Sequence, residues 1–278
     1  MSYITATTLE DALTALAAGP ASVIAGGTDW FPAQGDRHFD GTLVDISRLA
    51  DLRGVTKTDR GWRIGAATTW TEFINADLPP AFDGLKLAAR EVGSIQIQNT
   101  GTIAGNLCNA SPAADGVPPL LTLDASVQLT SGHGTREIAL CDFLQGVRKT
   151  DRAADEILTA IHIPDLPDGS KGCFVKLGAR KYLVISICMV AVVVRVNDGA
   201  VADIRVAIGA ASPVAQRLTE LETALRGLPA KGLTHAITDD LVHGLTPISD
   251  VRATADYRQA AATQVIRRAI TLALEGDA

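Results

Sequence analysis

Close to its N-terminus the chain reads Val23-Ile24-Ala25-Gly26-Gly27-Thr28-Asp29-Trp30. The apolar residues at the start of this stretch predict a short strand, and Thr28-Asp29 suits the beginning of a helix. Because glycine has no Cβ, Gly26-Gly27 would let backbone N–H groups surround a phosphate at close range. A double glycine after a strand is also common in a plain turn, so this stretch alone leaves both interpretations open.

A second stretch of small and polar residues occurs at Thr102-Ile103-Ala104-Gly105-Asn106. It lies within residues 93–119, which are rich in Gly, Asn, Ser and Pro and show little hydrophobic periodicity. A long irregular segment is uncommon inside a compact domain unless it has a function, so we expect the two loops to hold a diphosphate from opposite sides. Neither loop matches the glycine patterns of a Rossmann fold or a P-loop, so a dinucleotide would be bound by another fold.

The residues around the first loop predict a small α/β lobe over residues 1–54. Thr8 and Asp11 form a capping-box pattern and Gly19-Pro20 is a stop signal, which predicts a helix at 8–18. Residues 55–168 predict a second lobe that mixes strands and helices. In this lobe we expect a hairpin at 55–66, helices near 71–75 and 84–91, and strands at 126–130, 135–139 and 156–163.

A connector rich in proline and glycine at 164–169 predicts a domain boundary near residue 168. The apolar run 183–194 is too short to span a membrane and is interpreted as a buried strand. Beyond the boundary we expect strands at 174–177, 187–196 and 201–208, followed by helices at 214–226, 233–243 and 257–274. The predicted fold class is α+β, with a two-lobed domain over 1–168 and a domain of antiparallel strands covered by helices over 169–278.

The composition excludes several classes of function. A net charge of −6 offers no broad cationic surface, so nucleic acid is not an expected partner. Cysteines 108, 141, 173 and 188 are far apart and the five histidines are not grouped, so we expect neither an iron–sulfur cluster nor another metal site in this chain. The N-terminus lacks a secretory signal, which predicts a cytoplasmic protein with no membrane span. No pair of residues is assigned as a catalytic acid and base.

The two loops resemble the FAD loops of the flavoprotein subunit of the xanthine dehydrogenase and carbon monoxide dehydrogenase family. The resemblance continues through Ser111-Pro112-Ala113-Ala114-Asp115 and Ala255-Asp256-Tyr257-Arg258 and spans nearly the whole chain. It implies that residues 23–30 and 102–106 hold the FAD diphosphate and that Asp115, Leu158 and Lys176 are further flavin contacts. Ala104 departs from the family pattern, which usually has glycine there, and would add a methyl group near the diphosphate.

These last three residues also have structural interpretations that stay open. Asp115 could cap a helix, Leu158 could be a core residue, and Lys176 could be a solvated strand end.

The resemblance implies non-covalent FAD in this chain, with molybdopterin in a large partner subunit and iron–sulfur clusters in a small one. Such a heterotrimer could itself form a dimer. The chain would then pass electrons from the iron–sulfur clusters through FAD to NAD, oxygen or another acceptor, and the substrate would bind in a different subunit. Two alternatives remain, namely a self-sufficient FAD-dependent oxidase or dehydrogenase of the same flavin fold, and an assembly scaffold that binds no flavin.

Overall fold

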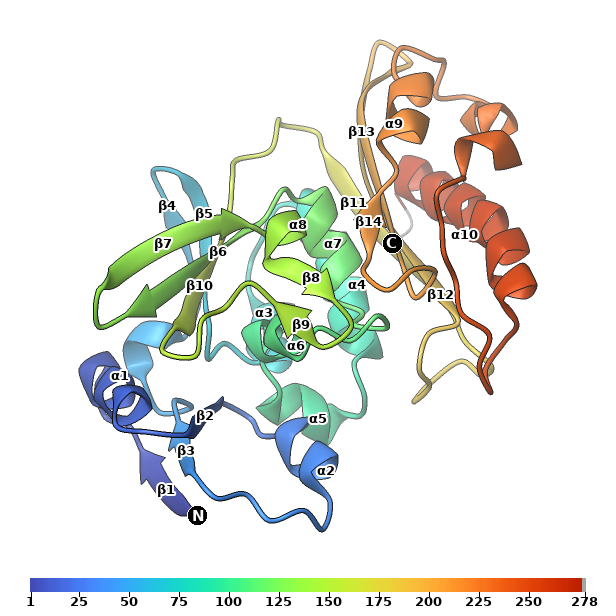
Figure 1. Cartoon of the computed structure of the whole chain (residues 1–278). Helices are drawn as coiled ribbons and strands as arrows, with labels where there is room; N and C mark the ends of the chain where they lie inside the picture. Colours follow the sequence, from blue (N-terminus) through green and yellow to red (C-terminus); the bar gives the residue numbers. More distant parts are fainter. Residues whose placement is uncertain (277–278) are drawn as a thin grey trace. The chain divides into compact units, whose positions relative to one another are not determined.

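The computed structural model describes residues 1–276 and divides into two compact units (Figure 1). Unit 1 consists of Met1–Ala76, Ser94–Ala110 and Ala125–Pro164, and unit 2 consists of Asp77–Gly93, Ser111–Asp124 and the described residues from 165 onward. Each unit therefore combines segments from different parts of the sequence. Both contain helices and sheets, and the predicted α+β class is confirmed.

Unit 1 begins with a small parallel sheet in the order β1 (Ser2–Thr5), β3 (Thr42–Asp45) and β2 (Ala21–Ile24). The predicted first helix is α1 (Leu9–Ala17), and its capping box between Thr8 and Asp11 is present. Strand β1 was not predicted from the sequence. All of its residues are exposed, so the strand lacks the alternation of apolar and polar residues that marks a half-buried strand.

A second sheet of unit 1 is antiparallel and contains the predicted 55–66 hairpin (Figure 1). Its strands are, in order, β4 (Val55–Thr58), β5 (Gly61–Gly65), β10 (Ile157–Ile163), β6 (Ser126–Ser131) and β7 (Gly134–Ala139). The other elements of the unit that lie outside residues 93–119 are α2 (Trp30–Gln34), η1 (Ala50–Leu52), α3 (Trp70–Asn75), α8 (Leu140–Phe143), β8 (Leu144–Gly146) and β9 (Lys149–Thr150).

The prediction of a long irregular segment at 93–119 is wrong. The structure places α5 (Ile95–Thr100) and α6 (Ile103–Asn109) of unit 1 there, and α7 (Val117–Thr122) of unit 2 begins within it. None of these helices is longer than seven residues. Helices this short depend on tertiary packing rather than on an amphipathic repeat, so hydrophobic periodicity does not reveal them.

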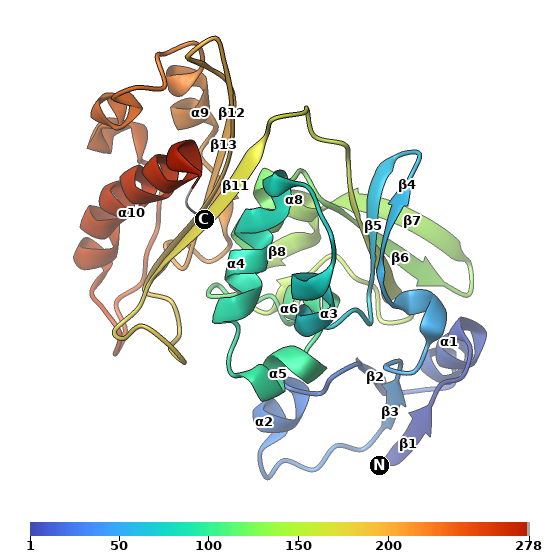
Figure 2. The same ribbon diagram turned by 180° about the vertical axis from the view of Figure 1, so that it is seen from behind.

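Unit 2 is built on an antiparallel sheet whose strands are β11 (Lys171–Leu177), β12 (Cys188–Asn197), β13 (Ala200–Gly209) and β14 (Gln216–Arg217). The long helix α10 (Ala255–Glu275) lies along one face, as Figure 1 shows. Figure 2 shows α4 (Asp83–Glu91) beside β11 from behind. The remaining helices of the unit are η2 (Pro80–Phe82), α9 (Thr219–Leu225), η3 (Leu233–Ala236) and η4 (Asp239–Leu241).

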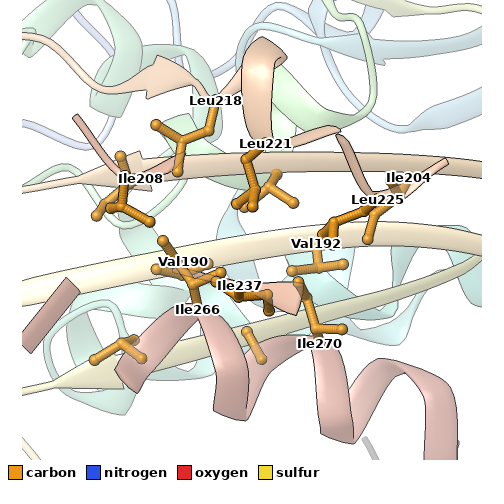
Figure 3. Close-up of a cluster of buried hydrophobic side chains, with 14 of the residues drawn as sticks. Val190, Val192, Ile204, Ile208, Leu218, Leu221, Leu225, Ile237, Ile266 and Ile270 are labelled. Atoms are coloured by element: carbon orange, nitrogen blue, oxygen red, sulfur yellow. The ribbon is translucent and has the colours of Figure 1, made fainter. Parts of the chain in front are cut away.

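The central strand β12 is buried on both faces. Val190 and Val192 pack with Ile266 and Ile270 of α10 in the apolar cluster of Figure 3. The intervening Ala191 belongs to a different cluster, which also contains Ala88 of α4. This alternation follows from the period of two in a strand, and it explains why the sequence shows a continuous apolar run there.

Three further predictions in unit 2 need correction. The predicted helix over 214–226 begins only at Thr219, as α9, because Gln216–Arg217 form the edge strand β14. The predicted strand over 183–194 begins only at Cys188, because Leu183 has a φ of +52° and lies in an exposed loop. The predicted helix over 233–243 is replaced by the short 3₁₀ helices η3 and η4. Among the described residues, no helix combines the length and hydropathy that a membrane span requires.

Candidate functional site

The first predicted loop leaves the end of β2 at Ile24 and leads into α2. Gly27 has a φ of +66°, a conformation that residues with a Cβ rarely adopt. The carbonyl oxygen of Gly27 accepts a hydrogen bond from the Phe31 amide at 3.2 Å. The sequence thus places a glycine where the chain turns sharply from a strand into a helix.

The amide groups of this loop are available to a ligand. No backbone N–H of residues 25–30 donates a hydrogen bond to another described residue. These residues are partly or fully exposed, so the N–H groups can be satisfied by solvent or by a bound anion. Neither this loop nor residues 102–106 contains lysine or arginine, so backbone dipoles rather than side-chain charge would stabilise that anion.

The second predicted loop forms the beginning of α6. The Thr102 side chain caps this helix by accepting a hydrogen bond from the Gly105 amide at 3.0 Å. The Ile103 amide donates to Thr68 at 3.3 Å, which ties the loop to the rest of unit 1. Ala104 is only 4% exposed, so its methyl group is enclosed within the unit. Ala104 replaces the glycine that is usual in the family, but its extra methyl group is therefore not expected to obstruct the diphosphate.

The structure brings the two loops together within unit 1. A Cβ added to Gly26 would lie 2.0 Å from the Thr100 carbonyl oxygen, so the two backbones are in direct contact. Similarly, a Cβ on Gly101 would lie 3.2 Å from Oγ1 of Thr28. Gly101 was not among the predicted site residues. Its position directly before the second loop was the available signal.

Asn106 supplies a further polar group at the second loop. Its side-chain Oδ1 is buried and has no hydrogen-bond partner among the described residues. A buried acceptor without a donor is costly, and it suits a site that a ligand with hydroxyl or N–H groups completes. Unpaired amides, glycines at points of close approach and this oxygen together fit a cofactor that carries a diphosphate, such as FAD.

Two predicted flavin contacts, Asp115 and Lys176, lie in unit 2 and bind each other. Lys176 Nζ is 2.7 Å from Asp115 Oδ2, and Ser186 Oγ donates to Asp115 Oδ1 at 2.6 Å. Burial raises the pKa of Asp115, and the Lys176 ammonium and the Ser186 hydroxyl oppose that change. The side chains of the ion pair are only 9% and 6% exposed, so Lys176 is not a solvated strand end. Asp115 does not cap α7, whose N-cap is Gly116.

The remaining predicted contact, Leu158, lies in β10 of unit 1. It is buried at 3% exposure and pairs with Leu129 across the sheet. A register shift follows it, between Leu158 and Ala160. Helix α6, which begins in the second loop, packs against this strand. The described residues contain no group of three or more His, Cys, Asp or Glu side chains positioned to bind a metal ion.

Comparison with family models divides the chain into two consecutive matches. Residues 1–166 match the FAD binding domain in molybdopterin dehydrogenase. Residues 174–273 match the CO dehydrogenase flavoprotein C-terminal domain. Together they cover most of the sequence, including both loops and the Asp115–Lys176 pair.

Individual relatives match along nearly their full length. The xanthine dehydrogenase FAD-binding subunit of Escherichia coli O157:H7 is 34% identical over 283 residues, which cover 98% of this chain and 97% of the relative. The structure is similar to carbon monoxide dehydrogenase from Hydrogenophaga pseudoflava, with a TM-score of 0.90, 27% identity and coverage of 99% and 97%. It is also similar to quinoline 2-oxidoreductase from Pseudomonas putida 86, with a TM-score of 0.88, 27% identity and the same coverage.

Proposed function

Because this chain belongs to the family of FAD-binding subunits of molybdenum hydroxylases, we propose that it transfers electrons through FAD between a partner subunit and an acceptor. Membership makes it an oxidoreductase subunit with FAD as its cofactor. FAD binding, on which the transfer role depends, is supported most directly by the unpaired amides of residues 25–30. Within this loop, Gly26 lies against the Thr100-Gly101 backbone. That arrangement suits a diphosphate.

The two loops would bind the FAD diphosphate through backbone N–H groups, and bound FAD supplies the redox chemistry. The Asn106 oxygen would accept a hydrogen bond from the cofactor. Asp115, Leu158 and Lys176 remain proposed contacts. The Lys176 ammonium already donates to Asp115 at 2.7 Å and to the Glu91 carbonyl at 3.4 Å, which leaves at most one N–H of the three for a cofactor.

The proposed partners are a large subunit that carries molybdopterin and a small subunit that carries iron–sulfur clusters. Support comes from the relatives. One is named as the FAD-binding subunit of a xanthine dehydrogenase, and the similar structures belong to a carbon monoxide dehydrogenase and a quinoline 2-oxidoreductase. Since similar chains serve such different substrates, we propose that the substrate binds in another subunit. A cytoplasmic location and a domain boundary near residue 168 are also proposed, the first from four cysteines that are all free thiols.

The visible absorption spectrum of the purified full chain tests the cofactor, and partner-dependent reduction tests the transfer role. We expect the absorbance of oxidised flavin, and bleaching by the hydroxylase substrate only when the partner subunits are present. A colourless chain that does not take up added FAD would instead support the assembly scaffold. Rapid bleaching by a small organic substrate without partners would support the self-sufficient oxidase.

A further inference from the structure

The segment between the first loop and β3 has few backbone constraints. Its helix α2 has only five residues, and Asp29 at its N-cap makes no side-chain hydrogen bond to the helix. Residues 35–38 lie outside any helix or strand and are exposed. The Gly27 and Asp29 carbonyls accept hydrogen bonds from the Phe31 and Ala33 amides at 3.2 and 3.0 Å. No described residue donates to the Gly26 or Thr28 carbonyl, so hydrogen bonds fix only part of the loop.

Aromatic side chains connect the two ends of this segment. The Phe31 ring lies on Gly27, because a Cβ there would be 2.7 Å from Cε2 of Phe31. The Trp30 ring meets the Phe31 ring edge-on at 5.1 Å between centroids, and the Phe39 ring at 5.3 Å. The Phe39 ring in turn lies on Gly41, where a Cβ would be 2.8 Å from its Cζ. The rings thus run from the glycine of the loop to the glycine just before β3.

We infer that Trp30, Phe31 and Phe39 form an aromatic clamp that holds the first loop in the shape that binds the FAD diphosphate. The inference rests on the proposed function. The loop is fixed on one side by the backbone contact of Gly26 with Thr100, and Phe31 covers it at the next residue. Core burial does not account for Phe31, which is 52% exposed. Its ring acts as a positioning group, since a loop that is already ordered binds a ligand at a lower entropic cost.

The dissociation constant of FAD, measured by titration of the full chain, tests the clamp. We expect Phe31→Ala to weaken FAD binding by about tenfold or more, because the loop must then be ordered upon binding. Phe31→Tyr retains the ring and should bind like the unsubstituted chain. Ile248→Ala, which shortens another exposed apolar side chain (62% exposed) in unit 2, is the matched control and should bind normally. A folded Phe31→Ala variant with unchanged FAD affinity would overturn the inference.

A second measurement does not depend on FAD. Arg37 lies in the clamped segment, and its side chain donates to the Gln34 carbonyl at 3.3 Å. In the FAD-free chain, trypsin should cleave after Arg37 faster in Phe31→Ala than in Phe31→Tyr or Ile248→Ala, as judged by mass spectrometry. If the unsubstituted chain binds no FAD, the proposed function fails. The cleavage rates then test only whether the clamp orders this segment. Equal rates in all variants would show that it does not.

Discussion

At the residue scale, the adjacent glycines of the first loop are required for different physical reasons. A Cβ on Gly26 would lie 2.0 Å from a backbone oxygen, which no side-chain rotation can relieve. We expect Gly26→Ala to destabilise unit 1 by about 1–3 kcal/mol or more, as overpacking does, and to lower FAD occupancy. Urea denaturation and the ratio of flavin to protein measure the two effects. Gly132→Ala is the control, because its Cβ would meet nothing within 4 Å; equal losses in both variants would contradict the explanation.

Gly27 is constrained by its φ of +66° and by the Phe31 ring. We expect Gly27→Val to remove FAD but to leave a folded protein, at a backbone strain of about 1–3 kcal/mol. The structure changes the reason for this effect: the new side chain would push against Phe31 instead of filling the space of the diphosphate. Circular dichroism measures folding, and the ratio of flavin to protein measures FAD occupancy. Gly244→Ala is the control, because Gly244 has a φ of +75° but its Cβ would meet nothing within 4 Å. Normal flavin occupancy in folded Gly27→Val would exclude Gly27 from the site.

The Asp115–Lys176 pair makes a testable contribution to stability. Lys176→Met would leave the Asp115 carboxylate buried without its cation, which is expected to cost about 3–5 kcal/mol. Replacing both, as Asp115→Leu with Lys176→Met, should recover much of that loss because no buried charge remains. Arg60→Met is the control, since Arg60 is 73% exposed where it pairs with Glu137 and should matter by at most about 1 kcal/mol. The measurement is the free energy of unfolding of each variant in urea. A double variant as unstable as Lys176→Met would refute this explanation.

At the scale of elements, the predictions succeed where a local signal agrees with the tertiary structure. The capping box of Thr8 and Asp11 marks the start of α1, and both of its hydrogen bonds are present. The turn at 197–199 correctly separates β12 from β13, helped by Asp198 and Gly199 at positive φ. In each case neighbouring residues carry the information, so reading along the sequence is sufficient.

The elements that were missed depend on contacts between distant residues. Helix α5 is stabilised through its contact with α3, including a 2.6 Å hydrogen bond between Thr71 and Asn99. The convergence of the two loops has the same origin, because Gly26 meets Thr100 more than seventy positions away in sequence. The paired glycine loops could be predicted as a site from the family resemblance. The Phe31 contact with Gly27 could not, because it depends on side-chain placement.

The beginning of α10 carries a pH-dependent anchor. Arg258 donates to the Ile187 carbonyl at 2.6 Å and to Asp250 Oδ1 at 2.8 Å. Partial burial alone would raise the pKa of Asp250, but hydrogen bonds from the Arg252 amide and the Arg258 guanidinium outweigh it and lower the pKa to about 2. The stabilisation by Asp250 is therefore complete above about pH 4, its unfolded pKa, and is lost as the pH falls through about 2.

Asp250→Asn tests this anchor. At pH 7 we expect the variant to be less stable by about 2 kcal/mol, because it lacks the carboxylate that Arg258 binds. The difference between the two proteins should shrink as the pH falls from 4 towards 2, where Asp250 itself becomes protonated. Urea denaturation of both proteins across this range is the measurement. A difference that stays constant with pH would show that the carboxylate charge is not responsible.

At the scale of the whole molecule, the chain provides a framework that binds a cofactor. The predicted site residues fall in both units, with residues 23–30, 102–106 and Leu158 in unit 1 and Asp115 and Lys176 in unit 2. The family could be predicted from the sequence because its motifs are distributed along nearly the whole chain. The substrate and the final acceptor cannot be predicted from this sequence, since a xanthine dehydrogenase FAD-binding subunit and chains of carbon monoxide dehydrogenase and quinoline 2-oxidoreductase share this framework.

The attachment of FAD provides the last prediction. The two loops contain no cysteine or histidine that could form a covalent bond to the flavin, so we expect acid precipitation to release intact FAD into the supernatant. The nearest candidate is the exposed Cys108, two residues after Asn106 in α6. Cys108→Ser should therefore release the same amount of FAD as the unsubstituted chain, measured by supernatant fluorescence. Flavin retained on the denatured polypeptide would disprove non-covalent binding, and its loss in Cys108→Ser would identify that thiol as the attachment point.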